Sequence, residues 1–279
     1  MSKGGWFGFR FRIHLLFWVV IGLSVATGHF LEVFTLFVIV LIHEFGHVAM
    51  AKELGWKVTE VQLLPFGGVA TMEDAYATDP LDEIVIALAG PFLNVVMMAL
   101  SYLFWFAGIW TEGWAQFFLV SNATIAAFNL LPIWPLDGGR ILQALLCWLM
   151  PYRRAAILSI LGSTLLAGIM LGLSIIDMKI NLLVIGSYLL AVNIQAFLRF
   201  PYQFFRFLME KYVRQPAEEY AVQALSVRPD ETVLEVSHKL RRGSAHLFYV
   251  QGTGLLGEEQ LLHALLFEQK HDTSVGQLV

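Results

Sequence analysis

Six long apolar stretches dominate this sequence and decide the solvent in which it can fold. A helix that crosses a bilayer needs roughly 20 mostly apolar residues. Stretches close to that length run over residues 13–28, 30–51, 84–110, 116–131, 155–176 and 180–200. We therefore expect an α-helical polytopic membrane protein with about six transmembrane helices. A signal peptide is the alternative for the first stretch, because Ser24-Val25-Ala26 resembles a cleavage site.

Composition supports a membrane setting and excludes two other classes. Hydrophobic residues make up 57% of the chain and charged residues 14%, whereas about a quarter of a soluble globular protein is charged. The net charge of −4 provides no basic surface for nucleic acid, so we expect no nucleic-acid partner. The single cysteine, Cys147, excludes an internal disulfide framework.

The distribution of lysine and arginine indicates the orientation. With six spans and an inside N terminus, a single basic residue, Lys179, falls on the outer side. The other side holds Lys3, Arg10, Arg12, Lys52, Lys57, Arg140, Arg153, Arg154, Arg199, Arg206, Lys211 and Arg214. Cytoplasmic loops carry the excess of basic residues, which predicts that both termini are cytoplasmic in a multi-pass protein of the cell membrane.

The composition changes after the last apolar stretch. We predict a transmembrane domain over 1–201, a linker over 202–222 and a small α+β cytoplasmic domain over 223–279. Strands are expected at 224–227 and 247–251, and helices at 232–241 and 258–267. A domain of this size is marginally stable alone and is expected to need pairing.

The second apolar stretch ends in His43-Glu44-Phe45-Gly46-His47. Residues four apart share a helix face, so His43 and His47 can bind one metal ion, and Glu44 can act as general base on water. The alternative is a pair of packed core histidines. Ionisable groups inside a membrane helix each cost a few kcal/mol and are functional by default, which favours the metal site.

A catalytic zinc ion takes three protein ligands, so a third must come from elsewhere. We favour Asp137, because the fourth span runs inward and brings Asp137 to the depth of the histidines. Pro132 and Pro135 interrupt the helix there, and Gly138 and Gly139 allow close approach of chain or metal. A helix N-cap is the alternative role for Asp137. Other acidic candidates are Glu73 and Asp74, in a polar loop, and Asp82 and Glu83, at the start of the third span.

Asn129 lies two turns before Asp137 on the fourth span. Its amide can donate a hydrogen bond to the oxyanion that forms when water attacks a peptide carbonyl. A hydrogen bond between packed helices is an almost equal alternative.

Together, His43-Glu44-Phe45-Gly46-His47 and the later Asn129…Pro135-Leu136-Asp137-Gly138 resemble the site-2 protease family of intramembrane metalloproteases, and in particular its bacterial sporulation branch. The resemblance implies that His43, His47 and Asp137 bind Zn²⁺ and that Glu44 activates water. It also implies six spans and a C-terminal domain related to cystathionine-β-synthase (CBS) domains. A β-like segment is implied over 58–72, where substrate adds as a strand; an ordinary hairpin is the alternative.

The resemblance further implies the substrate and partners. Its sporulation branch removes the membrane-associated pro-sequence of a sigma-factor precursor, in the membrane around the forespore, under the control of inhibitory membrane proteins. The C-terminal stretch departs from the CBS pattern at Gly257 and Gln260 and holds one repeat. It therefore predicts pairing or substrate docking as readily as ATP binding. Two rival functions are a CBS-regulated transporter and an inactive protease-like scaffold.

Overall fold

A computed structural model describes residues 10–13, 15–56, 58–64, 67–72, 79–176, 178–213 and 222–279. These residues form two compact units. The first comprises Met1–Ala75, Ile84–Leu131 and Leu136–Gly138, and the second comprises Tyr76–Glu83, Pro132–Pro135 and Gly139–Val279, within the described ranges. Several residues named above lie outside the described ones: Lys3, Lys57, Glu73, Asp74 and Arg214, and also Pro65 and Phe66 within the expected β-like segment 58–72.

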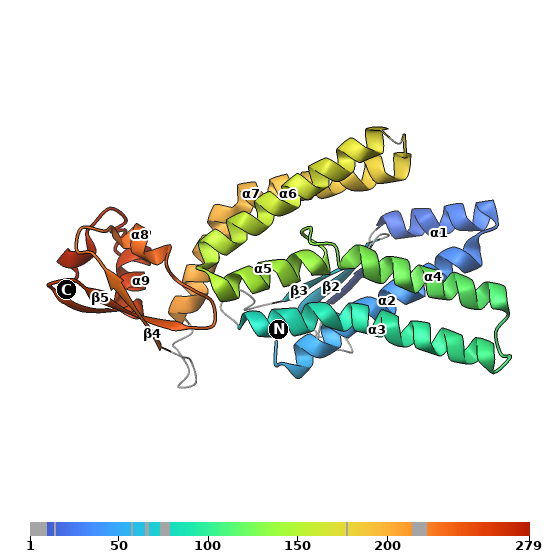
Figure 1. The fold of residues 1–279 in the computed structure, drawn as a ribbon, viewed down its shortest axis with the longest axis horizontal. Helices are drawn as coiled ribbons and strands as arrows, with labels where there is room; N and C mark the ends of the chain where they lie inside the picture. The colour runs from blue at the N-terminus through green and yellow to red at the C-terminus, as the bar shows by residue number, and fades with distance from the viewer. Residues whose placement is uncertain are drawn as a thin grey trace. The chain divides into compact units, whose positions relative to one another are not determined.

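The first unit combines helices with a small sheet (Figure 1). Helix α1 (Leu15–Thr27) is followed by α2 (Phe30–Glu53), and Gly28, at a φ of 77°, makes the turn between them. After α2 come β2 (Val58–Leu64) and β3 (Gly67–Met72), then α3 (Pro80–Phe106), which belongs to this unit from Ile84 onward, and α4 (Glu112–Asn129). Strand β1 (Arg10–Ile13) pairs parallel with β2, and β2 pairs antiparallel with β3. The sheet order β1-β2-β3 leaves β1 and β3 at its edges, and β2 and β3 contact α2.

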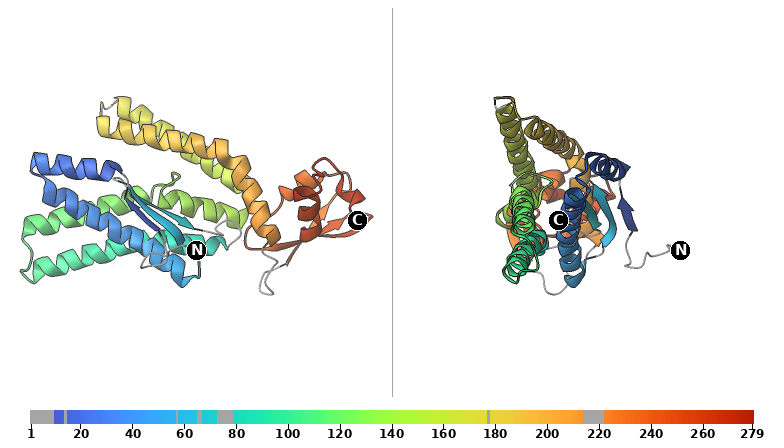
Figure 2. Two further views of the ribbon diagram at one scale, coloured as in Figure 1. Left: turned by 180° about the vertical axis from the view of Figure 1, so that it is seen from behind. Right: turned by 90° about the vertical axis from the view of Figure 1, so that its right-hand side faces the viewer.

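The second unit contains α5 (Asp137–Leu149) from Gly139 onward, α6 (Tyr152–Ile176), α7 (Ile180–Val213) and the C-terminal residues. Helices α6 and α7 run side by side in both views of Figure 2. They also hold the segment between α4 and α5. The N–H of Trp134 donates to Ser163 Oγ at 3.0 Å, and Asn193 Nδ2 donates to the Trp134 carbonyl at 2.6 Å. Ser163 and Asn193 are fully buried.

The C-terminal residues form the α+β arrangement that the sequence predicts. Strand β4 (Val222–Val227) pairs parallel with β5 (Ala245–Val250), and β5 pairs antiparallel with β6 (Gly254–Gly257). The helices are α8 (Val233–Ser237) and α9 (Glu258–Leu266), followed by a short 3₁₀ helix, η1 (Val275–Gln277). Helix α8 is shorter than the predicted 232–241, and β6 was not predicted.

One apolar core joins this C-terminal fold to the long helices of the second unit. It contains Tyr152 of α6 and Phe204 and Phe207 of α7, together with Phe248 of β5 and Val275 of η1. A backbone hydrogen bond also joins the two parts, because the N–H of Tyr152 on α6 donates to the Leu240 carbonyl of the C-terminal fold at 3.1 Å. The predicted linker, 202–222, therefore begins inside α7, which continues through Pro201 to Val213.

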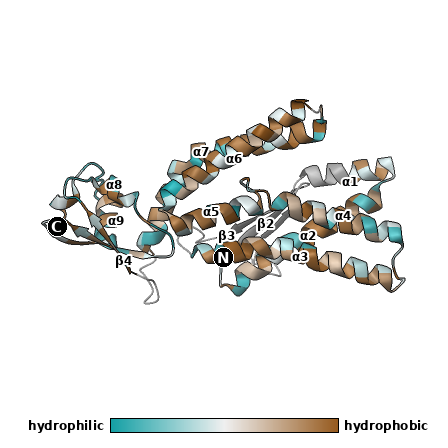
Figure 3. Ribbon diagram, viewed as in Figure 1, coloured by the Kyte–Doolittle hydropathy of each residue, from teal (hydrophilic) through white to brown (hydrophobic). Residues whose placement is uncertain are grey.

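Four described helices are long and apolar enough to cross a membrane, namely α2, α3, α6 and α7. Figure 3 shows that hydrophobic residues make up much of these helices, whereas hydrophobic and hydrophilic residues are more mixed in the C-terminal fold. Helix α1 has 13 residues and α4 has 18, and neither is among the four. The protein is thus a mostly helical membrane protein, and the count of six spans stays a prediction.

Candidate metal centre

The two histidines of the His-Glu-x-x-His motif lie one turn apart on a buried face of α2. His43 is 2% exposed and His47 is 4% exposed. Between them, Gly46 lets α2 approach α3 closely, because a Cβ there would lie 2.7 Å from the carbonyl oxygen of Ala89. Burial of two imidazoles on an apolar helix requires polar partners for their ring nitrogens.

Asp137 reaches the histidines because the loop after α4 closes on itself and brings Gly138 against Leu130. Helix α4 ends at Asn129, and residues 130–136 form the turn before α5. The turn is tight, since a Cβ on Gly138 would lie 2.1 Å from the Leu130 carbonyl oxygen and one on Gly139 would lie 2.6 Å from Trp134 N. The prediction that these glycines permit close approach is thus confirmed for chain against chain. Asp137 occupies the first turn of α5, where the helix dipole favours a carboxylate.

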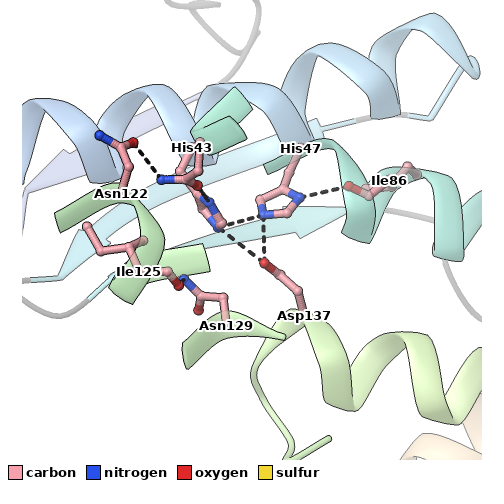
Figure 4. Close-up of polar contacts among 8 residues, drawn as sticks. His43, His47, Ile86, Asn122, Ile125, Asn129 and Asp137 are labelled. Carbon is pink, nitrogen blue, oxygen red and sulfur yellow. Dashed lines mark hydrogen bonds and ion pairs between the residues drawn. The ribbon is translucent and has the colours of Figure 1, made fainter. Parts of the chain in front are cut away.

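The three side chains meet at one point, as Figure 4 shows. Asp137 Oδ2 lies 3.2 Å from His43 Nε2 and 3.3 Å from His47 Nε2, and the two Nε2 atoms are 3.2 Å apart. Asp137 is 7% exposed. Among the described residues, these three form a group with the spacing of metal ligands. Tetrahedral bonds of about 2.0–2.1 Å to zinc would put ligand atoms about 3.3 Å apart.

The hydrogen bonding of His47 also fits a cation. Its Nδ1 lies 2.8 Å from the backbone carbonyl of Ile86. A carbonyl only accepts, so Nδ1 carries a proton, and the Nε2 of the neutral, metal-binding form of the imidazole presents a lone pair. That lone pair faces a carboxylate oxygen at 3.3 Å. Two acceptors at this separation repel each other unless a cation lies between them, and zinc is a cation that this His₂-carboxylate set suits.

Residues of α3 and α4 that were not predicted from the sequence support the two histidines. His43 Nδ1 is within hydrogen-bonding distance of Asn94 Oδ1, and Asn94 Nδ2 donates to Asn122 Oδ1 at 3.0 Å. Gly90 provides the space for both rings, because a Cβ there would lie 2.4 Å from His47 Nε2 and 2.8 Å from His43 Cε1. The sequence does contain a signal for these contacts, namely the side-chain amides of Asn94 and Asn122 in two apolar helices. Burying an amide without a partner costs free energy, as burying a charge does.

The remaining predicted residues take different places. Glu44 follows His43 on α2 and is half-buried. Asn129 lies at the end of α4, where its Nδ2 donates to the Ile125 carbonyl at 3.1 Å (Figure 4). Glu83, one of the alternative third ligands, instead accepts from Arg242 Nη1 at 2.6 Å within the second unit.

Comparison with known proteins agrees with this chemistry. The family model for Peptidase family M50 matches residues 31–111 and 106–169. A zinc metalloprotease of Methanocaldococcus jannaschii is 32% identical over 191 residues, which cover 65% of this chain and 56% of that protein. The solved structure of the site-2 protease from Methanocaldococcus jannaschii is 29% identical, with a TM-score of 0.55 over 70% of this chain and 92% of that one.

The chain therefore belongs to peptidase family M50, the site-2 proteases, and is a zinc metalloprotease of membranes. Within this family it is similar along almost its whole length to stage IV sporulation protein FB of Bacillus subtilis (strain 168). The two are 30% identical over 278 residues, which cover 97% of this chain and 96% of the relative.

Proposed function

We propose that this protease hydrolyses a peptide bond of a membrane-associated protein near the cytoplasmic face of the bilayer. The observation that carries the proposal is the buried triangle of His43, His47 and Asp137, with edges of 3.2–3.3 Å. These three residues would hold zinc. The bound metal would supply the Lewis acidity that brings the pKa of water toward neutrality.

Glu44 is the proposed general base and acid. It takes the proton from the attacking water and then gives it to the leaving amine. Glu44 is half-buried and directly follows His43 on α2. This is the position that holds the general base in the His-Glu-x-x-His motif of metalloproteases. Asn129 is the proposed donor to the oxyanion. An amide has two N–H donors, and the bond to Ile125 uses one of them.

The small sheet of the first unit offers an edge to which a substrate peptide could add as a strand. A peptide must be extended before water can attack it, and adding a strand to a sheet edge holds it so. Strand β3 is such an edge, and it contacts α2, which carries His43 and His47. We propose that substrate pairs with β3, within the segment 58–72 that the sequence singled out.

Similarity to stage IV sporulation protein FB supports a proposal for the substrate and the regulation of this protease. We propose that the substrate is a sporulation sigma-factor precursor and that inhibitory membrane proteins regulate cleavage, in the membrane around the forespore. Both termini would be cytoplasmic, on the basis of the basic-residue distribution. The C-terminal fold would be CBS-like and would serve pairing or substrate docking.

Co-expression with a membrane-tethered sigma-factor precursor tests this function. Wild-type protein should release the shortened factor, whereas the Glu44→Gln variant should lose about 10²–10⁴-fold in rate, the usual contribution of a general base. The matched control is Glu53→Gln, an exposed glutamate on the same helix, which should cleave normally. Equal cleavage by wild type and Glu44→Gln would contradict the mechanism, and cleavage by neither would contradict the substrate.

A further inference from the structure

One face of α3 is built around the two histidines. Ile86, Gly90 and Asn94 are spaced four apart, so they share a face of the helix. Ile86 offers its carbonyl to His47, Gly90 gives room to both rings and Asn94 meets His43. His43 and His47 are also four apart, so each ring of α2 has its own partner on α3.

The partner of His43 belongs to a chain of amides with a fixed direction. Asn122 Nδ2 donates to the Phe118 carbonyl at 2.8 Å, which turns Asn122 Oδ1 toward α3. Asn94 Nδ2 donates to that oxygen at 3.0 Å, which turns Asn94 Oδ1 toward His43. Both asparagines are 0% exposed. Because an amide cannot reverse without losing its donor bond, the backbone of α4 sets the orientation of both side chains.

This direction determines which nitrogen of His43 carries the proton. Asn94 Oδ1 can only accept, so the facing Nδ1 must donate. The Nε2 of a neutral imidazole is then left with its lone pair, and it faces Asp137 Oδ2 at 3.2 Å. His47 reaches the same state through the Ile86 carbonyl.

We propose that Asn94 is a positioning residue for His43, with Asn122 as its anchor, and that the pair holds Nε2 of His43 in the tautomer and orientation that bind metal. The proposal rests on the metal-ligand role of His43 given above. Residues that orient a histidine ligand in this way usually contribute 10- to 100-fold to metal affinity. Asn94 therefore acts on the site without touching the metal or the substrate.

A polar link between α3 and α4 could instead serve only helix packing. The protein contains a matched example of that role. Ser101 is 1% exposed on α3, and its Oγ donates to the Ala115 carbonyl of α4 at 3.1 Å. It lies seven residues beyond Asn94, about 10 Å along the helix axis. Ser101→Ala is therefore the control for loss of a buried α3–α4 hydrogen bond away from the histidines.

The test measures zinc affinity of the purified full-length protein by competition with a chromophoric chelator. Asn94→Leu, which is similar in size but has no acceptor, should bind zinc about 10- to 100-fold more weakly. Asn94→Asp keeps an acceptor for Nδ1 and should stay within a few-fold of wild type. Ser101→Ala should bind zinc normally. Asn122→Leu, which leaves Asn94 in place without its anchor, should show a smaller loss than Asn94→Leu.

Two results would overturn the inference. One is an unchanged zinc affinity in Asn94→Leu, and the other is an equal loss in Asn94→Asp and Asn94→Leu, because the acceptor would then be irrelevant. If Asn94→Leu cannot be purified, the Asn122→Leu and Asn94→Asp affinities decide, and wild-type affinity in Asn122→Leu counts against the anchor. His43→Ala separates this inference from the proposed function. If His43→Ala binds zinc like wild type, the metal-ligand assignment itself fails.

Discussion

At the scale of single residues, the missing side chain of Gly90 shapes the metal centre as much as the ligands do. A Cβ at this position would overlap both imidazoles, with contacts of 2.4 Å to His47 and 2.8 Å to His43. A methyl group at this position would lie between the backbone of α3 and the two hydrogen-bonded imidazoles, so the neighbouring atoms have little room to move aside. Overpacking of this kind costs about 1–3 kcal/mol.

Gly90→Ala should therefore weaken zinc binding by roughly tenfold, which corresponds to about 1.4 kcal/mol and lies within that range. Chelator competition on the purified protein measures it. Gly162→Ala is the control, because Gly162 is also helical, on α6, but has open space where its Cβ would stand. Normal zinc affinity in Gly90→Ala would show that the rings can move aside at no cost.

Asn129 provides a second prediction at this scale. If its amide donates to the oxyanion, Asn129→Ala should lower kcat by about 10²–10³-fold and leave KM and zinc content close to wild type. A helix-packing role would instead lower the thermal stability and leave kcat of the folded fraction unchanged. Steady-state cleavage, measured beside zinc content, distinguishes the two.

The three proposed ligands could be predicted from sequence because each carries a strong local signal. His43 and His47 have helical spacing inside an apolar run, and Asp137 follows two prolines that break a helix. Asn94 and Asn122 were not predicted, because a neutral amide in an apolar helix is a weaker signal of function than a charged group. Their partners lie 51 and 28 residues away in the sequence, so spacing along the chain gave no indication of contact.

At the scale of elements, tertiary packing extended helices that local rules would end. Pro201 favours a helix end near residue 200, yet α7 continues to Val213. The reason is that Phe204, Phe207 and Leu208 recur at helical spacing and are buried in the core of the second unit. Helix α5 was not predicted because its 13 residues are too few for a membrane span. Strand β1 pairs with β2 although α1 and α2 separate the two strands in the sequence, and no local pattern predicts such a long-range contact.

A largely buried ionic cluster links α7 to the C-terminal fold. Glu258 accepts from Lys211 Nζ at 2.7 Å, and also from the backbone N–H and the Nδ1 of His246, at 2.8 and 2.7 Å. Burial alone would raise the pKa of the Glu258 carboxyl. The hydrogen bonds and charges of His246 and Lys211 outweigh burial, so the pKa lies below its usual 4.5.

This shift predicts how stability depends on pH. Because the folded-state pKa is lowered, the contribution of Glu258 is complete above about pH 4.5 and is lost as the pH falls through the lower folded value. Glu258→Gln should therefore unfold at a lower temperature than wild type at pH 7, and the gap should narrow below about pH 4.5. Glu259→Gln, an exposed neighbour on α9, is the control. A gap that does not change with pH would contradict the prediction.

At the scale of the whole molecule, the proposed metal ligands come from distant parts of the chain. His43 and His47 come from α2 and Asp137 from the first turn of α5. A bound ion stabilises the folded state by mass action, by about 2.7 kcal/mol when its concentration is 100 times Kd. Removal of zinc by a chelator should therefore lower the apparent melting temperature of the wild-type protein in detergent. His43→Ala should melt at the same temperature with and without chelator, and a chelator effect of equal size in this variant would contradict zinc binding at His43.

The shared core of the second unit also bears on the timing of biosynthesis. Its members extend from Cys147 to Val275, so α6 and α7 have emerged from the ribosome before β5, α9 and η1 exist to cover Phe204 and Phe207. During that interval, Phe204 and Phe207 of α7 lack the partners that finally cover them. The final packing of the end of α7 is therefore reached only after β5, α9 and η1 have been made. Ribosome-bound chains that stop before β5 would contain the metal ligands, but they would lack the fold that holds the end of α7.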